Sequence, residues 1–367
     1  MKRFLRALRR RPVALICVVI LVLLYIGAIF AEFLAPYEAN TVFREHPFHP
    51  PNVRLYSSEL GLRLQVQRHV LVDESNWSYA PIRGDYVPVR LFAVGPEYRL
   101  LGLIPLRRHL LGTDAPYPNL PGWDQRGRTY PVFLMGADNL GRDLFSRVLY
   151  GSRISLTIGF VGTAISLTLA IALGGLAGYF GGTVDWIIMR IAELVILIPG
   201  LYLILFLRSV LSRELDSGQS FMLITVILSF VGWPGSARLI RGLVHSIKRE
   251  DFVINAQLEG IPPLVIIFRH IVPQMSSILI VSTTLAIPGF ILGEAILSYL
   301  GLGIVDPAVS WGSLLSREVT QVTILRAFPW FLYPGLFLLL ATLGFNFVGD
   351  LLRDVFDPYY RDDKVLS

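Results

Sequence analysis

The sequence has little of the chemistry that most enzymes and secreted proteins use. Cysteine occurs once, as Cys17, which excludes an intrachain disulfide. Lysine occurs only at Lys2, Lys248 and Lys364, and none of the three follows a glycine. A phosphate-binding P-loop needs a lysine after a glycine-rich turn, so an ordinary P-loop is excluded. The chain also lacks H-E-x-x-H and G-x-S-x-G motifs, and we predict no catalytic, cofactor or metal residues.

Charge is missing from long stretches of the chain. Runs without Asp, Glu, Lys or Arg cover residues 12–31, 154–184, 219–237, 271–293 and 327–349. A helix that crosses the hydrocarbon core needs about 20 apolar residues, and continuous runs of this kind favour helices over a barrel. The run 186–207 is similar in length and carries Arg190 and Glu193 near its start. The sequence therefore predicts six spanning helices.

We predict an all-α polytopic membrane protein with a small β-containing insert outside the membrane. The six helices are expected near residues 12–35, 153–178, 184–210, 219–244, 274–300 and 328–351. Residues 36–150 form the external insert, in which 62–67 alternates with period two, as strands do. Residues 86–92 are a second expected strand, at an edge of the sheet because of Pro88.

The basic residues orient this arrangement. Six of them precede the first apolar run: Lys2, Arg3, Arg6, Arg9, Arg10 and Arg11. Under the positive-inside rule they place the N-terminus in the cytoplasm. We favour this over a nucleic-acid-binding arm, and we favour an uncleaved anchor over a signal peptide because the apolar run is longer than a signal h-region. The predicted parts are 1–35 (basic N-terminus and first helix), 36–150 (insert), 151–352 (five-helix core) and 353–367 (cytoplasmic tail).

A cytoplasmic segment at 245–273 divides the predicted core. Its sequence suggests a short helix, a break at Gly260, a turn at Pro262 and Pro263, and a second helix that ends before Pro273. A short helix at the base of a membrane protein suits docking of a cytosolic partner. A plain connecting loop is the alternative.

This segment resembles the cytoplasmic loop of permeases of binding-protein-dependent ABC importers. The family pattern is E-A-A-x-x-x-G, about nine residues, then I-x-L-P. Ala256, Gly260 and Pro273 fall at the expected spacing, while Asn255 and His270 differ from the pattern. The resemblance implies that the coupling to an ATPase involves Asn255, Ala256, Glu259, Gly260, Pro262, Arg269, His270 and Pro273.

Other segments are similar to the dipeptide, oligopeptide and nickel branch of the same family. Residues 136–147 resemble its G-T-D-x-x-G-R-D-x-x-S-R signature, and 293–303 resemble G-E-A-x-L-S-F-L-G-L-G. The likeness implies a permease subunit that lacks an ATPase site of its own and moves a peptide or related small solute. It further implies two cytosolic ATPases that bind the ATP, an external solute-binding protein and a bacterial-type cytoplasmic membrane. It favours a second, paralogous permease, and a homodimer of this chain stays open. A peptide, a nickel chelate and a peptide-like antibiotic all stay open as solutes.

Glu294 is the one charge expected deep in the outer half of a spanning helix. An ionisable group there faces protein or a water-filled path, so it is either a residue of the translocation path or a structural hydrogen-bonding group. Two other functions remain compatible with the sequence, an ion-gradient-driven secondary transporter and a non-transporting membrane assembly protein. The glycines Gly174, Gly175 and Gly178 predict close packing between helices.

Overall fold

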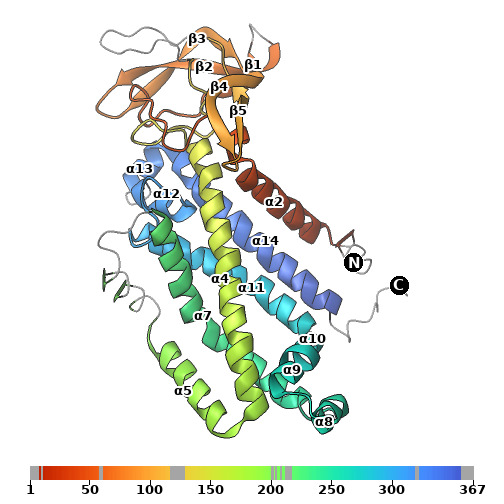
Figure 1. The fold of residues 1–367 in the computed structure, drawn as a ribbon. Helices are drawn as coiled ribbons and strands as arrows, with labels where there is room; N and C mark the ends of the chain where they lie inside the picture. The colour runs from red at the N-terminus through yellow and green to blue at the C-terminus, as the bar shows by residue number, and fades with distance from the viewer. Residues whose placement is uncertain are drawn as a thin grey trace, which may run out of the picture. The chain divides into compact units, whose positions relative to one another are not determined.

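The computed structural model describes residues 8, 9, 11–57, 61–115, 129–199, 202, 205, 206, 209, 210, 217–318 and 322–356. They belong to two compact units, and four helices contribute residues to both. The first unit covers Met1–Val22, Leu156–Leu297 and Leu338–Ser367. The second covers Leu23–Ser155 and Ser298–Phe337. Figure 1 shows the course of the chain.

The described part of the first unit is helical. It contains most of α2 (Pro12–Ile29), α4 (Leu144–Phe180), α11 (Ser276–Tyr299) and α14 (Tyr333–Phe356), and all of α5 (Gly182–Leu197), α7 (Ser217–Ile247) and α8 (Asp251–Leu258). Between α8 and α11 lie α9 (Pro263–Val265), the π-helix η1 (Ile266–Ile271) and α10 (Val272–Gln274).

Helix α4 packs against α7 through glycines. A Cβ atom on Gly174 would lie 2.5 Å from the carbonyl oxygen of Ala237, and one on Gly178 would lie 2.6 Å from that of Arg241. Any larger residue would therefore force the two backbones apart. The predicted close packing at these two glycines is confirmed.

The second unit combines short helices with β-structure. Its helices are α3 (Ala31–Leu34), α12 (Trp311–Glu318), α13 (Val322–Ala327) and the 3-10 helix η2 (Pro329–Leu332). Its strands are β1 (Val53–Ser57), β2 (Gly61–Asp73), β3 (Ser78–Pro88), β4 (Arg90–Leu100) and β5 (Ile104–Gly112). The first three form one antiparallel sheet in the order β1-β2-β3, and β4 pairs with β5 in a separate hairpin.

The β-structure lies between the first and second spans, as predicted, but its strands are divided differently. The expected strand 86–92 is shared between β3 and β4, which belong to different sheets. β3 ends at Pro88, which has no N–H to donate to a ladder. The three buried valines Val66, Val87 and Val89 pack with Tyr130 and Val132 in a core beneath the strands.

Five of the described helices are long and apolar enough to cross a membrane: Pro12–Ile29, Leu144–Phe180, Gly218–Ile247, Ser276–Tyr299 and Pro329–Phe356. The predicted helix at 184–210 is described as α5 to Leu197, and part of it lies outside the described residues. Helix α4 starts at Leu144, nine residues before the predicted 153. Asp143 caps it, since its carboxylate accepts the Ser146 N–H at 2.8 Å.

Candidate functional site

The C-terminal end of α8 is closed by a glycine. Gly260 has a φ of +75°, a left-handed conformation that glycine adopts without a Cβ penalty. Its N–H donates to the carbonyl of Gln257 at 3.0 Å, and the N–H of Ile261 donates to the carbonyl of Ala256 at 3.1 Å. This bond pattern is the Schellman motif. The short helix and the glycine break predicted from the sequence are both present.

Helix α8 buries one side and exposes the other. Val253 and Ala256 are buried in the helical core of the first unit. On the other side Ile254 is 42% exposed and Leu258 is 81% exposed. These two residues are four apart and therefore share a helix face. The outer face of α8 thus carries a small apolar surface. Figure 1 shows α8 at one end of the group of helices.

The predicted coupling residues lie in one continuous segment, but some of them are exposed and others are buried. Those with exposed positions are Asn255, Glu259, Gly260, Pro262, Arg269 and Pro273. His270 is partly buried and Ala256 is buried, so Ala256 holds α8 in place instead of offering a contact. The family pattern did not single out Leu258 or Ile254. The signal that could have found them is the i and i+4 spacing of Ile254 and Leu258, which places both on the helix face opposite Val253 and Ala256.

The second helical part of the segment differs from the sequence prediction. It runs through Pro273 to Gln274, whereas an end before Pro273 was expected. In η1 the helix widens, so that the N–H of Val272 donates to the carbonyl of Ile267 five residues earlier. Pro273 then lies in the first turn of α10, where its missing N–H costs no hydrogen bond. The expectation was wrong because the π-turn resets the hydrogen-bond pattern just before the proline.

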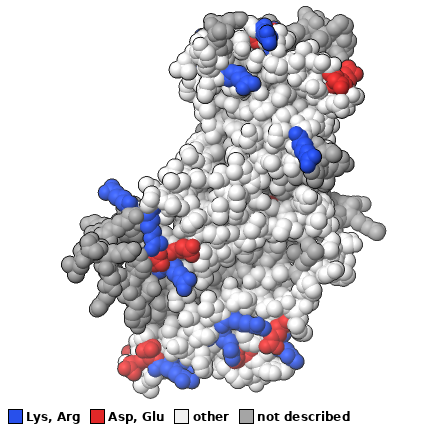
Figure 2. All heavy atoms as spheres, turned by 180° about the vertical axis from the view of Figure 1, so that it is seen from behind, with Lys and Arg blue, Asp and Glu red and all other residues white. Residues whose placement is uncertain are grey.

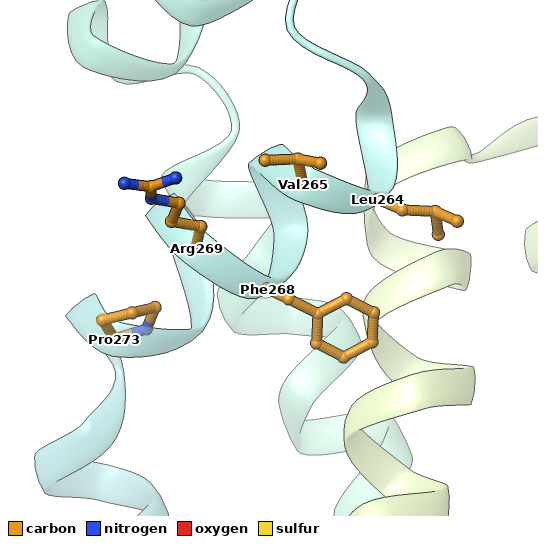
Figure 3. Close-up of a pocket in the computed structure, with 5 residues that line it drawn as sticks. All are labelled: Leu264, Val265, Phe268, Arg269 and Pro273. Atoms are coloured by element: carbon orange, nitrogen blue, oxygen red, sulfur yellow. The ribbon is translucent and has the colours of Figure 1, made fainter.

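A surface pocket of about 570 Å³ lies along α9, η1 and α10. It is lined by Leu264, Val265, Phe268, Arg269 and Pro273. In Figure 3 the side chains of Leu264 and Phe268 extend to one side of the ribbon, and that of Arg269 extends to the other. The pocket is apolar with a single positive charge, so it suits an apolar side chain of a partner better than a charged one.

The end of α4 fastens this segment to the membrane helices. Lys248 Nζ donates to the backbone carbonyl of Tyr179 at 2.6 Å and lies 5.8 Å from the centre of its ring. Gln257 Nε2 of α8 donates to the Tyr179 hydroxyl at 3.2 Å. A bidentate ion pair between Arg241 of α7 and Asp185 of α5 lies nearby in the same unit. Sequence reasoning missed Tyr179 because aromatic residues at helix ends are common and carry no specific signal.

Charges around the segment are mostly balanced. From 248 to 259 there are two basic residues, Lys248 and Arg249, and three acidic ones, Glu250, Asp251 and Glu259, which gives a net charge of −1. In the lower part of Figure 2, basic and acidic side chains lie together in groups, with uncharged surface above them. The exposed apolar side chains are therefore a more distinctive feature of this surface than its net charge.

Glu294 lies in α11 and is fully buried. Its burial fits the rule that a charge within a spanning helix faces protein. Its place in the translocation path stays a prediction.

A second polar feature of the helical unit is a small cavity of about 40 Å³, which is large enough for water. Its hydroxyl-bearing lining residues are Thr163, Ser166, Ser236, Ser282 and Thr283. Both α7 and α11 contain a proline, Pro234 and Pro288, close to these residues in the chain. Each proline removes one helix hydrogen bond.

The signature at 136–147 folds into a clamped turn in the second unit. Asp138 is almost fully buried, and its carboxylate accepts from Arg142 Nε at 2.6 Å and lies 3.2 Å from Arg147. Both arginines also reach Asp306, at 2.9 and 3.2 Å. A Cβ on Gly141 would lie 2.0 Å from the Phe43 carbonyl oxygen. The signature residues therefore hold the chain in shape before α4.

Three histidines cluster in the second unit. The ring centre of His49 lies 4.9 Å from that of His46 and 5.0 Å from that of His69. Burial lowers the pKa of His46 to about 4 and that of His49 well below its usual value. Among the residues that the structure describes, no group of three His, Cys, Asp or Glu side chains is arranged to hold a metal ion.

The histidine cluster makes the second unit sensitive to acid. The pKa of His46 in the folded protein lies below the ordinary 6.5, so the unfolded chain takes up a proton at a higher pH than the folded one does. The folded state therefore has its full stability above pH 6.5 and loses stability as the pH falls towards 4. The loss is up to about 3 kcal/mol, at 1.36 kcal/mol per pKa unit. We expect the hydrogen-exchange protection factors of the β1–β3 amides, corrected for the intrinsic pH dependence of exchange, to fall over this pH range. His46→Phe should flatten the dependence, and an unchanged pH profile in that variant would contradict the assignment.

Comparison with known proteins decides the family. The model of the binding-protein-dependent transport system inner membrane component matches residues 170–362. That range is more than half of the chain and contains α8 and its exposed face. The chain belongs to this family. A second model, the N-terminal TM domain of oligopeptide transport permease C, matches residues 1–51 of this permease.

Relatives of the permease support the same branch. It is 39% identical over 227 residues to the oligopeptide transport system permease protein OppC of Haemophilus influenzae, which covers 62% of this chain and 70% of that protein. It is 38% identical over 227 residues to the dipeptide transport system permease protein DppC of Bacillus subtilis, with 62% and 68% covered. Among solved structures, the inward-facing MetNI methionine ABC transporter aligns with 57% of this chain and 97% of that chain, at 16% identity and a TM-score of 0.43.

The permease is accordingly a multi-pass membrane protein and a transport subunit of an ABC importer of the oligopeptide and dipeptide permease family, with no catalytic role of its own. Among the functions compatible with the sequence, this confirms the importer over a secondary transporter or an assembly protein.

Proposed function

We propose that this permease moves peptides across a bacterial cytoplasmic membrane, using ATP bound by two separate ATPase subunits. The named relatives transport oligopeptides and dipeptides, which favours peptides over nickel chelates. A second, paralogous permease would complete the pore, and an external binding protein would deliver the solute. Six spanning helices with both termini in the cytoplasm fit this arrangement, with the division at 1–35, 36–150, 151–352 and 353–367.

The observation that carries the proposal is the exposed apolar face of α8. Leu258 is 81% exposed on a helix whose other side is buried in the helical core. A solvated apolar residue on a rigid, capped helix is typical of an anchor in helix-in-groove recognition. The adjoining pocket at Phe268 extends the same apolar surface.

The same contacts supply a route for coupling within the first unit. Ala256 and Val253 of α8 belong to one buried cluster with Ile266, Ile267 and Ile271. A displacement of α8 by an ATPase would therefore move η1 and the start of α11. Coupling requires that the ATPase bind the two pore states with different affinities. In this scheme ATP binding by the partners stabilises one state and its hydrolysis releases it.

Replacing Leu258 by aspartate is expected to separate the permease from its ATPase. A charge in an apolar contact is costly, whereas the exposed position leaves folding unaffected. We would purify the tagged complex in mild detergent and identify the co-purifying proteins by mass spectrometry. A P-loop ATPase should accompany the wild type and be lost with Leu258→Asp.

The matched control is Leu62→Asp, because Leu62 is an equally solvated leucine (87% exposed) on β2. The control should retain the ATPase. Retention of the ATPase by the Leu258 variant would contradict the docking assignment, and absence of any ATPase from the wild type would contradict the importer subunit itself.

A further inference from the structure

The far end of the β4–β5 hairpin carries large apolar side chains in the open. Leu101 is 54% exposed, Leu103 is 80% exposed and Ile104 is 55% exposed. They follow one another around the turn that joins the two strands. Surface apolar residues that occur singly need no explanation, but a contiguous group marks an interaction surface.

The turn itself is built from unusual residues. Leu101 has a φ of 51° and Gly102 has a φ of 74°, and the N–H groups of Gly102 and Leu103 donate to the carbonyls of Arg99 and Leu100 at 3.0 Å each. Hairpin turns in water use Asn, Asp or Gly at positions of positive φ. A leucine there costs roughly 1–2 kcal/mol of backbone strain. Leucine at this position therefore lowers the stability of the turn and places an apolar side chain at the tip.

The hairpin is fastened to the end of the first spanning helix. His109 Nδ1 lies 2.9 Å from the carbonyl oxygen of Ala35, and the ring of Phe92 packs against that of Phe33 at 6.0 Å. Both partners belong to the short stretch that follows α2. Figure 1 shows β4 and β5 beside this end of α2.

Two parts of the hairpin approach the end of α2. His109, which pairs with Ala93 near the base of the hairpin, contacts Ala35, and Glu97 and Arg99, nearer the tip, share a pocket of about 720 Å³ with Glu32 and Arg153. Arg153 in turn donates to the carbonyl oxygens of the last turn of α2, at 2.5 and 2.8 Å. The strand residues that lead to the tip therefore lie near the last turn of α2.

Charge near the tip complements a lipid surface. Between residues 97 and 108 there are three arginines, Arg99, Arg107 and Arg108, against one acid, Glu97, which gives a net charge of +2. Glu97 pairs with Arg107 at 2.9 Å. Exposed apolar side chains beside basic ones are typical of segments that lie in the interface of an anionic membrane. The lipid-facing surface of α2 also continues here, since Ile29 and Phe30 are 44% and 41% exposed and Phe92 is 55% exposed.

We propose that the tip Leu101–Ile104 of the β4–β5 hairpin inserts into the lipid leaflet on the β-sheet side of the membrane. The insertion is shallow, because the outer edges of a two-stranded sheet carry unpaired N–H and C=O groups that hydrocarbon does not satisfy. Side chains of the tip enter by about 5–10 Å, as in other interfacial segments. The hairpin thereby anchors the second unit to the bilayer at a point away from the spanning helices.

The test places a fluorescent probe on the tip of the full-length permease. Leu103→Cys in a Cys17→Ser background is labelled with an environment-sensitive fluorophore. The protein is reconstituted in nanodiscs of phosphatidylethanolamine and phosphatidylglycerol. We expect blue-shifted emission, loss of most of the intensity with lipids that carry a nitroxide near the headgroup, and little quenching by aqueous iodide. Leu62→Cys, on β2, is the control and should show the reverse.

Ile104→Cys provides a second labelled position in case the Leu103 variant fails to fold, and it should behave as Leu103→Cys does. Quenching of the tip probes by iodide, as at the Leu62 site, would overturn the proposal. Protection from both quenchers would overturn it as well, because it would show that protein and not lipid covers the tip.

Discussion

Asp138→Ala is expected to destabilise the second unit strongly. Its carboxylate is almost fully buried and meets the side chains of Arg142 and Arg147, which are themselves buried. It also accepts the backbone N–H groups of Leu140 and Arg142 at 2.9 and 2.8 Å. Removal leaves two arginines short of a counter-charge, and breaking a buried pair in this way costs about 3–5 kcal/mol. Thermal unfolding of the purified permease should show a large loss of stability relative to the wild type.

Asp306→Ala is the matched control for this prediction. Asp306 contacts the same two arginines, but its side chain is 28% exposed. Solvent screens such a pair, so the loss should be about 1 kcal/mol or less. Equal effects of the two substitutions would show that burial does not set the strength of this network. A small effect of Asp138→Ala would show that the signature turn is held by its backbone alone.

Gly260→Arg is expected to abolish ATP-dependent uptake while the chain stays folded. Nothing lies within 4 Å of a Cβ built at this position, so the substitution brings no clash within the permease, only the strain of a φ of +75°. The new side chain would project from the end of α8, next to the exposed Leu258. Loss of an interface anchor costs about 2–4 kcal/mol. That range corresponds to roughly 30- to 700-fold weaker docking.

Gly260→Asn separates strain from docking. Asparagine tolerates a left-handed conformation better than most residues and is small. Both variants should remain folded, Gly260→Asn with the smaller loss of stability, but only Gly260→Arg should lose uptake of a labelled peptide into proteoliposomes that contain the whole complex. If both variants lose uptake equally, the Schellman end of α8 itself is what matters. If neither does, the assignment of α8 as the docking helix is wrong.

Much of the membrane architecture followed from the sequence because its cause is local. A spanning helix needs a charge-free run of sufficient length, and such runs predicted all five of the described spans. The end of α8 was predictable for a similar reason, since a glycine at the correct place permits the left-handed turn. The close approach of α4 and α7 required only the small size of Gly174 and Gly178.

Predictions failed where hydrogen bonding depended on neighbours distant in the sequence. The run 86–92 has a strand pattern throughout, yet Pro88 ends β3 and the following residues pair with β5 in another sheet. The second helix of the cytoplasmic segment was expected to end before Pro273, yet the helix continues past this residue after the π-turn of η1. Pattern alone did not distinguish these outcomes, because each depends on which partner satisfies the backbone.

By itself, the sequence determined that this is a membrane protein and located the five described spans. It also determined that the chain has no P-loop and which segment resembles a coupling loop. Composition and spacing suffice for these conclusions because they act over a few adjacent residues. Only the tertiary structure decided that Ala256 is buried while Leu258 is exposed, that Tyr179 holds the segment, and that the β4–β5 hairpin contacts the stretch after α2. Those facts depend on which surfaces pack together, and packing joins residues far apart in the chain.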